Sequence, residues 1–250
     1  MNRVISWFSC GAASAYATYL AYEKYGDSLE AVYCRVKEES EDNLRFLSEF
    51  IEKTGIPVKV IGDESMDYSI FKVFHKRKFI KGPNGAPCTM ILKKEVRKAY
   101  QRIDDVQIFG YTIEEMNRVD RFIDSNNEVI TDFILVDQNI TKQDCMWWFN
   151  DMGFKLPEMY RLGYANNNCI GCVKGGMGYW NKIKVDFPEH FNKMAKTERD
   201  IGHAINKGKE GPVYLDELHP DRGSFKRDQP ADCGFTCEYK QVNLDLSEKL

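Results

Sequence analysis

The fold of this chain is decided by residues 3–14, which read RVISWFSCGAAS. Residues 3–8 form a short apolar run typical of a buried strand, and the small residues 9–12 predict a tight turn. Residues 13–25 are rich in Ala, Tyr and Leu and predict a helix. A helix N-terminus after such a turn binds anions, because its first backbone N–H groups are unpaired and small residues let a phosphate approach them. Alone, the pattern favours an ordinary strand-to-helix turn over a phosphate site.

Outward from this loop, strand-like and helix-like segments alternate along the chain. Strands are expected at residues 29–36, 57–61, 106–110 and 132–136, and helices at residues 41–54, 90–102, 141–152 and 188–205. Thr141 is expected to cap its helix together with Asp144. The alternation predicts parallel βαβ units and therefore an α/β fold.

The composition changes at about residue 164, after which Gly, Asn and Cys become frequent. We therefore expect a core over residues 1–164 and a C-terminal cysteine-containing region over residues 165–250. With 43% hydrophobic residues and a net charge of −3, the chain has the balance of an ordinary globular protein, although a local basic patch could be hidden in that total. No long apolar run and no signal peptide stand out, so a cytoplasmic protein without a membrane partner is expected.

The eight cysteines need an explanation other than disulfides, because the cytosol keeps thiols reduced. Cys34 lies in an apolar run and Cys145 in a helical segment, so both are expected in the core. The other six lie in turn-like or Gly-containing surroundings, namely Cys10, Cys88, Cys169, Cys172, Cys233 and Cys237. The Cys-x-x-Cys pair at 169 and 172 places two thiolates at one metal and usually needs further ligands.

Two metal models follow from the cysteine spacing. In one, Cys169, Cys172, Cys233 and Cys237 hold a structural zinc ion, which leaves Cys88 free. In the other, an iron–sulfur cluster is held by Cys88, Cys169 and Cys172, with Cys233 or Cys237 as the fourth ligand. Thiolate ligands suit both metals, so the spacing leaves the two models open.

Several segments together resemble a known family. The loop Ser9–Ser14 resembles the pyrophosphate loop, or PP-loop, of the adenine nucleotide alpha hydrolase superfamily. Residues 109–118, 137–153 and 157–172 resemble, in the same order, segments of its phosphoadenylyl-sulfate (PAPS) reductase-like branch. Cys88 resembles the earlier cysteine of that branch's metal cluster.

The resemblance implies a three-layer α/β sandwich with a mainly parallel central sheet, in which residues 1–164 form the nucleotide-binding core. It implies nucleotide contacts from Ser9, Cys10, Gly11, Ala12, Ala13, Ser14, Gly110 and Arg118. It favours an iron–sulfur (4Fe-4S) cluster on Cys88, Cys169, Cys172 and Cys233, with zinc as the alternative.

The departures from the family pattern concern its chemistry. Ala13 stands where members that cleave ATP usually carry Asp, and Cys10 stands where they carry Gly. Thr89 follows Cys88, whereas the iron–sulfur reductases carry a pair of cysteines there. Residues 232–237 match the reductases' C-terminal cysteine motif only in part, since no histidine follows. These differences weaken the case for ATP cleavage and for sulfonucleotide reduction, but they leave the case for nucleotide binding intact.

We expect an enzyme that couples adenylylation by ATP, with Mg²⁺, to sulfur transfer. The first alternative is reduction of adenylyl sulfate or phosphoadenylyl sulfate, with Cys233 or Cys237 as the catalytic nucleophile. The second alternative is a nucleotide-binding protein without catalysis, suggested by Ala13. A sulfur-donor protein or a thioredoxin-like reductant is the expected protein partner, and a nucleic acid is one candidate acceptor.

A few further side chains are candidates for the site. Lys93, Arg118 and Arg121 could hold phosphate or sulfate. The acidic start of the helix at 38–42 is most simply a solvated helix end, with contact to ribose or magnesium as the functional alternative. Residues 174–180 could be a flexible anion-binding lid or a connector packed by its aromatic residues. The four histidines show no ligand spacing and are expected at the surface.

Overall fold

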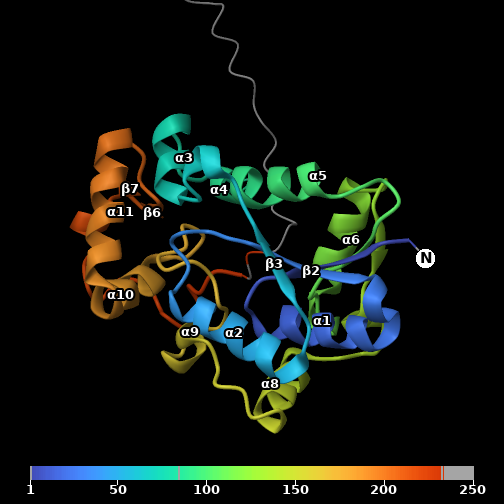
Figure 1. Ribbon diagram of the computed structural model, residues 1–250. Coiled ribbons are helices and arrows are strands. Elements are labelled where there is room, and N and C mark those ends of the chain that lie inside the picture. Colours follow the sequence, from blue (N-terminus) through green and yellow to red (C-terminus); the bar gives the residue numbers. More distant parts are fainter. Residues whose placement is uncertain (1, 84, 232, 234–250) are drawn as a thin grey trace, which may run out of the picture.

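A five-stranded parallel sheet forms the centre of the protein, which we describe from a computed structural model covering residues 2–83, 85–231 and 233 (Figure 1). Its strands are β1 (Val4–Phe8), β2 (Leu29–Cys34), β3 (Val58–Ile61), β4 (Val106–Ile108) and β5 (Ile130–Asp132). The strand order is β3-β2-β1-β4-β5, and every neighbouring pair is parallel. The predicted α/β fold is therefore confirmed.

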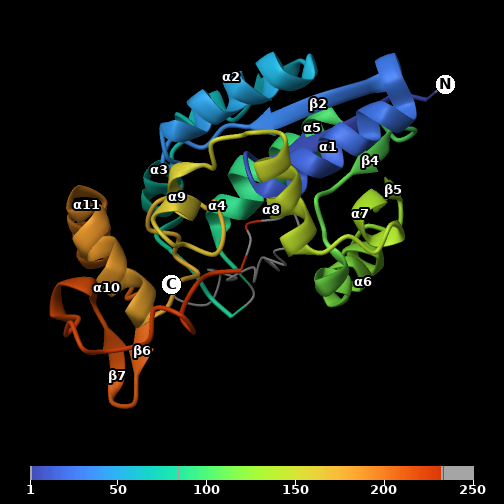
Figure 2. The same ribbon diagram turned by 90° about the horizontal axis from the view of Figure 1, so that it is seen from below.

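Helices cover both faces of this sheet and complete three layers (Figure 2). The longer ones are α1 (Ala12–Tyr25), α2 (Asp42–Thr54), α3 (Ile70–Arg77), α6 (Met116–Ser125), α8 (Lys142–Asp151), α10 (Met177–Asp186) and α11 (Pro188–Ile201). The shorter ones are α4 (Pro87–Thr89), the π-helical η3 (Met90–Glu95), α5 (Val96–Tyr100), α7 (Ile134–Asp137), α9 (Glu158–Arg161) and the 3₁₀ turns η1 (Gly26–Ser28), η2 (Glu64–Met66), η4 (Ile113–Glu115) and η5 (Leu215–Glu217).

Alternating side chains of β1 show how the layers form. Val4 and Phe8 point into a core made with α1, α2 and α8, whereas Ile5 and Trp7 point to the opposite face, which α5 and α6 cover. All four side chains are buried, which explains why the strand reads as a continuous apolar run.

A further core lies beside the sheet and joins distant parts of the chain. The fully buried Phe74 of α3 and Leu92 of η3 belong to the same cluster as Trp180 and Phe191 of α10 and α11. Beyond α11, the chain forms a small hairpin of β6 (Asn206–Gly208) and β7 (Gly211–Val213). The described part of the C-terminal region thus shares a core with α3 and η3, and the division of the chain at residue 164 stays a prediction.

Several predicted elements differ from the structure at their ends. The strand expected at residues 132–136 is wrong, because β5 ends at Asp132 and α7 begins at Ile134; a short apolar run fits both elements equally well. The helix expected to reach residue 205 ends at Ile201, where Gly202 adopts a left-handed φ of 73°. The capping of α8 by Thr141 and Asp144 is confirmed.

The glycine-rich segment 174–180 is a packed connector, and the alternative of a flexible lid is wrong. It leads into α10, whose Tyr179 and Trp180 are 1% and 0% exposed, so neither ring can stack on a ligand. Among the residues that the structure describes, no helix is both long and apolar enough to cross a membrane.

Candidate functional site

The site lies where the order of the strands reverses. From β1 the chain proceeds to β2 and β3 on one side of the sheet, and it then returns to place β4 and β5 on the other side. In open α/β sheets, ligands bind at such a switch point, beyond the carboxyl ends of the strands. Here the loop Ser9–Ser14 follows β1 and residues 109–112 follow β4, so the structure brings these two predicted segments together.

The loop Ser9–Ser14 is held in shape by its own hydrogen bonds. The hydroxyl of Ser14 accepts from the backbone N–H of Ser9 at 3.0 Å and from its hydroxyl at 2.9 Å. Cys10 adopts a left-handed φ of 56°, a conformation that favours glycine, and its buried thiol contacts the carbonyl of Asn43 at 3.7 Å. The N–H of Ala12 points to the hydroxyl of Tyr160 at 3.3 Å. The loop is therefore preorganised, and the thiol of Cys10 faces the core.

Gly110 lets the end of β4 touch the start of α1. A Cβ atom at this position would lie 2.5 Å from both the Cα and the N atom of Ser14, and 2.8 Å from the carbonyl carbon of Ala13. Such distances are far below ordinary contact, so only glycine allows this approach. Gly110, which the resemblance implies as a nucleotide contact, is thus required for the packing of the loop itself.

An outer pocket of about 270 Å³ opens on one side of the loop. Its lining consists of Gly11, Ala13, Thr112, Glu114, Glu115, Arg118, Lys142, Tyr160, Asn166 and Ala231. Arg118, predicted to bind the nucleotide, is ion-paired with Glu115 and lies over the ring of Tyr111 at 5.0 Å. Lys142 donates to the carbonyl of Ala165 and to Asn166 Oδ1, both at 2.5 Å. The two cations of this pocket are therefore already oriented by neighbours.

A smaller inner pocket of about 40 Å³ lies on the other side of the loop. Its lining consists of Trp7, Phe8, Ser9, Ser14, Cys34, Lys93, Phe109, Gly110, Tyr111 and Cys233. Cys34 is buried, as predicted, and it also faces this pocket. The inner pocket therefore joins the loop serines to a cation and to two thiols.

Lys93 lies in a buried ion pair with Glu39. The two side chains are 9% and 3% exposed, and Nζ lies 3.1 Å from the carboxylate, which also accepts from Tyr33 and Asn43. Burial acts to lower the pKa of Lys93, but the charge of Glu39, the nearby Cys233 and Cys169 and the hydrogen bond to Glu39 together outweigh it and hold that pKa well above the ordinary value. Lys93 is therefore held in its charged form.

Two of the acidic residues before α2 are buried, so the prediction of a solvated helix end is wrong for Glu38 and Glu39. Besides Glu39, Glu38 is 3% exposed and accepts from Ser69 Oγ at 2.6 Å and from the N–H of Ile70 at 2.9 Å. Glu38 thus caps α3, because a carboxylate favours the unpaired N–H groups at a helix N-terminus.

The predicted cysteine ligands gather beside the inner pocket. Cys169 and Cys172 are 8% and 7% exposed, and Cys233 acts electrostatically on both, while the Thr89 hydroxyl next to Cys88 lies 3.5 Å from Cys233 Sγ. Burial raises the pKa of Cys172 to about 11. Among the described side chains, no three His, Cys, Asp or Glu residues are arranged to hold a metal ion. Cys237 lies outside the described residues.

Other candidates lie away from the two pockets. Cys145 is buried in α8, as predicted. Arg121 is exposed and donates to the carbonyl of Asn117 in its own helix. Of the histidines, His75 and His219 are exposed, whereas His190 and His203 are half-buried.

Two asparagines connect the loop to the C-terminal segment, and the sequence analysis missed them. Asn167 donates to the carbonyl of Cys10 at 2.8 Å. Asn168 donates to the carbonyl of Ala231 at 3.0 Å and accepts from the N–H of Cys233 at 2.9 Å. Because Ala231 lines the outer pocket and Cys233 the inner one, these bonds fix the segment that borders both. A run of asparagines carries no sequence signal for such pairing.

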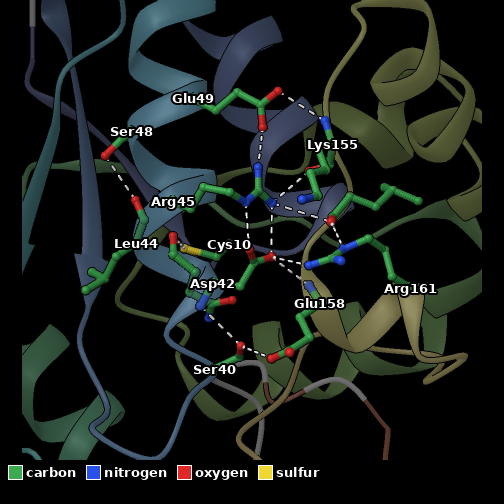
Figure 3. Close-up of polar contacts among 12 residues, drawn as sticks. Cys10, Ser40, Asp42, Leu44, Arg45, Ser48, Glu49, Lys155, Glu158 and Arg161 are labelled. Carbon is green, nitrogen blue, oxygen red and sulfur yellow. Dashed lines mark hydrogen bonds and ion pairs between the residues drawn. The ribbon is translucent and has the colours of Figure 1, made fainter.

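An ion-pair network centred on Asp42 holds the segment that carries Tyr160 (Figure 3). Asp42 accepts two bonds from Arg45, at 2.6 and 3.0 Å, and one from the N–H of Glu158 at 2.8 Å. Arg161 lies 3.3 Å from the same carboxylate. The start of α2 is thus tied to α9, and Tyr160 is held against the loop.

We expect Asp42→Asn to loosen residues 157–162 and to lower the free energy of unfolding at pH 7 by about 1–3 kcal/mol, because charge-assisted hydrogen bonds are lost. Hydrogen exchange of these amides should become faster. The hydrogen bonds from Arg45 lower the pKa of Asp42. Its contribution is therefore present above the unfolded pKa, about 3.9, and disappears as the pH falls through the folded value.

The matched control is Glu49→Gln. Glu49 pairs with Arg45 and accepts from the N–H of Lys155 at 3.1 Å, and glutamine keeps an oxygen for the second of these contacts. The Glu49→Gln variant should leave the hydrogen exchange of residues 157–162 unchanged. Equal exchange in the wild type and Asp42→Asn would show that the network does not position Tyr160.

The comparisons with known proteins give one distant relative. No family model matches the chain. An uncharacterized protein of Methanocaldococcus jannaschii is 24% identical to it over 226 residues. The match covers 88% of this chain and 53% of that protein, so the chain spans about half the length of its relative.

Proposed function

We propose that the chain binds an adenine nucleotide at the loop Ser9–Ser14 and belongs to the PAPS reductase-like enzymes. The observation that carries the proposal is the contact between this loop and Gly110 at the switch point of the sheet, with a pocket on either side. The start of α1 supplies backbone N–H groups and a favourable dipole for the phosphates. Ser9, Arg118 and Lys142 add side-chain donors at the pocket walls.

The reaction we favour is adenylylation coupled to sulfur transfer. An acceptor oxygen attacks the α-phosphorus of ATP and pyrophosphate leaves. A sulfur nucleophile then forms a bond to the acceptor carbon and displaces AMP, which takes the electron pair of the broken C–O bond. The outer pocket, which Ala13 lines, has room for the nucleotide phosphates, and Mg²⁺ would accompany them.

Reduction of an adenylyl sulfate is the second candidate, favoured by the place of Cys233 in the inner pocket beside Ser14 and Lys93. There the thiolate would attack the sulfonate sulfur and release AMP, or 3′-phospho-AMP from the phosphorylated substrate. A dithiol reductant would then release sulfite from the cysteine and become a disulfide.

For the sulfur-transfer reaction, in which Cys233 is not the nucleophile, we further propose that Cys88, Cys169, Cys172 and Cys233 are the ligands of an iron–sulfur cluster. The donors fit in kind, because all are thiols and two are deeply buried beside Cys233. When bound, such a cluster would supply an iron site for sulfur or electrons. A cluster on these residues would lie next to the inner pocket, because Cys233 is part of the pocket lining.

Two assays distinguish the reactions. Pyrophosphate release from ATP in the presence of a sulfur donor supports sulfur transfer, whereas sulfite release from adenylyl sulfate with thioredoxin supports reduction. If neither product forms although ATP raises the melting temperature, the chain is a nucleotide-binding protein without catalysis.

Metal content tests the cluster. Protein purified without oxygen should be brown and contain about four iron atoms per chain. Cys172→Ala should lose the colour, and Cys145→Ala, which removes a buried thiol from a different core cluster than that of Cys169 and Cys172, should keep it. Colourless protein with one zinc ion per chain would contradict the cluster.

A further inference from the structure

A strongly basic segment stands out in a chain whose net charge is negative. No Asp or Glu occurs between Asp67 and Glu95. The same interval carries Lys72, Lys76, Arg77, Lys78, Lys81, Lys93 and Lys94. The first four of these lie on or directly after α3, about 60 residues after the loop Ser9–Ser14 in the sequence. The proposed nucleotide site does not use them.

The four basic residues on or directly after α3 are exposed. Helix α3 buries Ile70, Phe71, Val73 and Phe74, which leaves its basic residues at the outside. Helix α11 packs against α3 (Figure 1). Its Lys193 reaches the ring of Phe71 at 4.0 Å, and Lys196 is exposed one turn further on. We call Lys72, Lys76, Arg77, Lys78, Lys193 and Lys196 the basic patch.

Within the described part of the protein, no member of the basic patch forms an ion pair, although the exposed Glu189 and Asp200 lie on the same helix as Lys193 and Lys196. Asp67 acts on Lys72, but it is already paired with Lys37 at 2.9 Å. Favourable interaction with the helix dipole accounts for cations in the last turn of α3. It does not account for Lys72 in the first turn or for the lysines of α11.

We propose that the basic patch binds the sugar–phosphate backbone of a nucleic acid. Lysine and arginine side chains on one surface neutralise the regularly spaced phosphates of such a backbone. A membrane or a protein partner would call for apolar anchors within the patch. The large hydrophobic side chains that are exposed among the described residues lie elsewhere, and none is in α3 or α11.

The helix that carries most of the basic patch also covers the core that contains two of the cysteines. The buried Phe71 and Phe74 of α3 belong to the same core cluster as Cys169 and Cys172. The basic side chains lie on the opposite, exposed face of α3. The inference concerns binding alone and goes beyond the nucleotide reaction.

The test is fluorescence anisotropy with a labelled DNA duplex and an RNA hairpin of about 20 base pairs, between about 50 and 200 mM KCl. The wild type should bind at least one of them, with an affinity that falls steeply with salt. The variant Lys72→Gln/Lys76→Gln/Arg77→Gln/Lys78→Gln should bind at least about tenfold more weakly, and its log–log salt slope should be shallower by about 3.

The control variant removes the same charge from exposed positions on other elements, namely Lys98→Gln, Arg121→Gln, Lys155→Gln and Lys226→Gln. It should bind within about twofold of the wild type if the contacts are localised to the basic patch. Circular dichroism checks that both variants fold. The proposal is overturned if neither nucleic acid binds at the lowest salt, if both variants lose affinity equally, or if vesicles with phosphatidylserine bind the patch and nucleic acids do not. None of these outcomes depends on ATP binding.

Discussion

Replacing Gly110 by Ala should lower the free energy of unfolding by about 1–3 kcal/mol and weaken ATP binding by at least about tenfold. The added Cβ would lie 2.5 Å from the backbone of Ser14, so β4 and the start of α1 must separate. That separation displaces the N–H groups that are proposed to bind phosphate. Urea unfolding and calorimetric titration with ATP measure the two effects.

Gly11→Ala is the control for the stability effect. A Cβ atom at Gly11 would meet its nearest neighbours, the hydroxyls of Tyr160 and Ser9, at 3.4 and 3.5 Å, which is ordinary contact. Its free energy of unfolding should stay within about 0.5 kcal/mol of the wild type. If Gly110→Ala is as stable as Gly11→Ala and binds ATP normally, the close approach of Gly110 to Ser14 is needed neither for stability nor for ATP binding.

Breaking the buried ion pair should have the largest effect on stability. We expect Lys93→Met or Glu39→Gln to lower the free energy of unfolding by about 3–5 kcal/mol, because each leaves its partner as an uncompensated buried charge or dipole. The double variant should recover a large part of this loss. Urea unfolding of the four proteins at pH 7 gives the coupling between the two residues.

Lys37→Met is the matched control for the ion pair. Lys37 pairs with Asp67 at 2.9 Å, but both side chains are more than half exposed, so its loss should leave stability nearly unchanged. If the double variant loses as much free energy of unfolding as the two single variants together, the two residues are not coupled in the native protein.

The sequence was sufficient for the parts of the fold in which local pattern and burial agree. Alternating strands and helices predicted the parallel sheet, and Thr141 predicted the start of α8. The pattern did not predict the end of β5, because the apolar residues 133–136 fit a strand as well as they fit the helix that begins at Ile134. Short apolar runs acquire their structure from the surrounding packing.

The site was harder to predict than the fold, because its polar side chains depend on partners that are distant in the sequence. Glu39 lies at the acidic start of a predicted helix, a position typical of solvated side chains. It is nevertheless buried, and it pairs with Lys93, which lies 54 residues away in the sequence. Asn168 reads as part of a loop, yet it holds the N–H of Cys233. Periodicity and spacing identify the loop and the cysteines but carry no information about such pairs.

The central claim is that an adenine nucleotide binds at the loop between β1 and β4. Hydrogen exchange with and without ATP, read out at peptide resolution, tests it most directly. We expect ATP to slow exchange in residues 9–15 and 110–113, where the two segments meet, and to leave α3 and α11 unchanged. If ATP binds but protects other segments only, or if millimolar ATP changes no exchange rate, the nucleotide site is not at this loop.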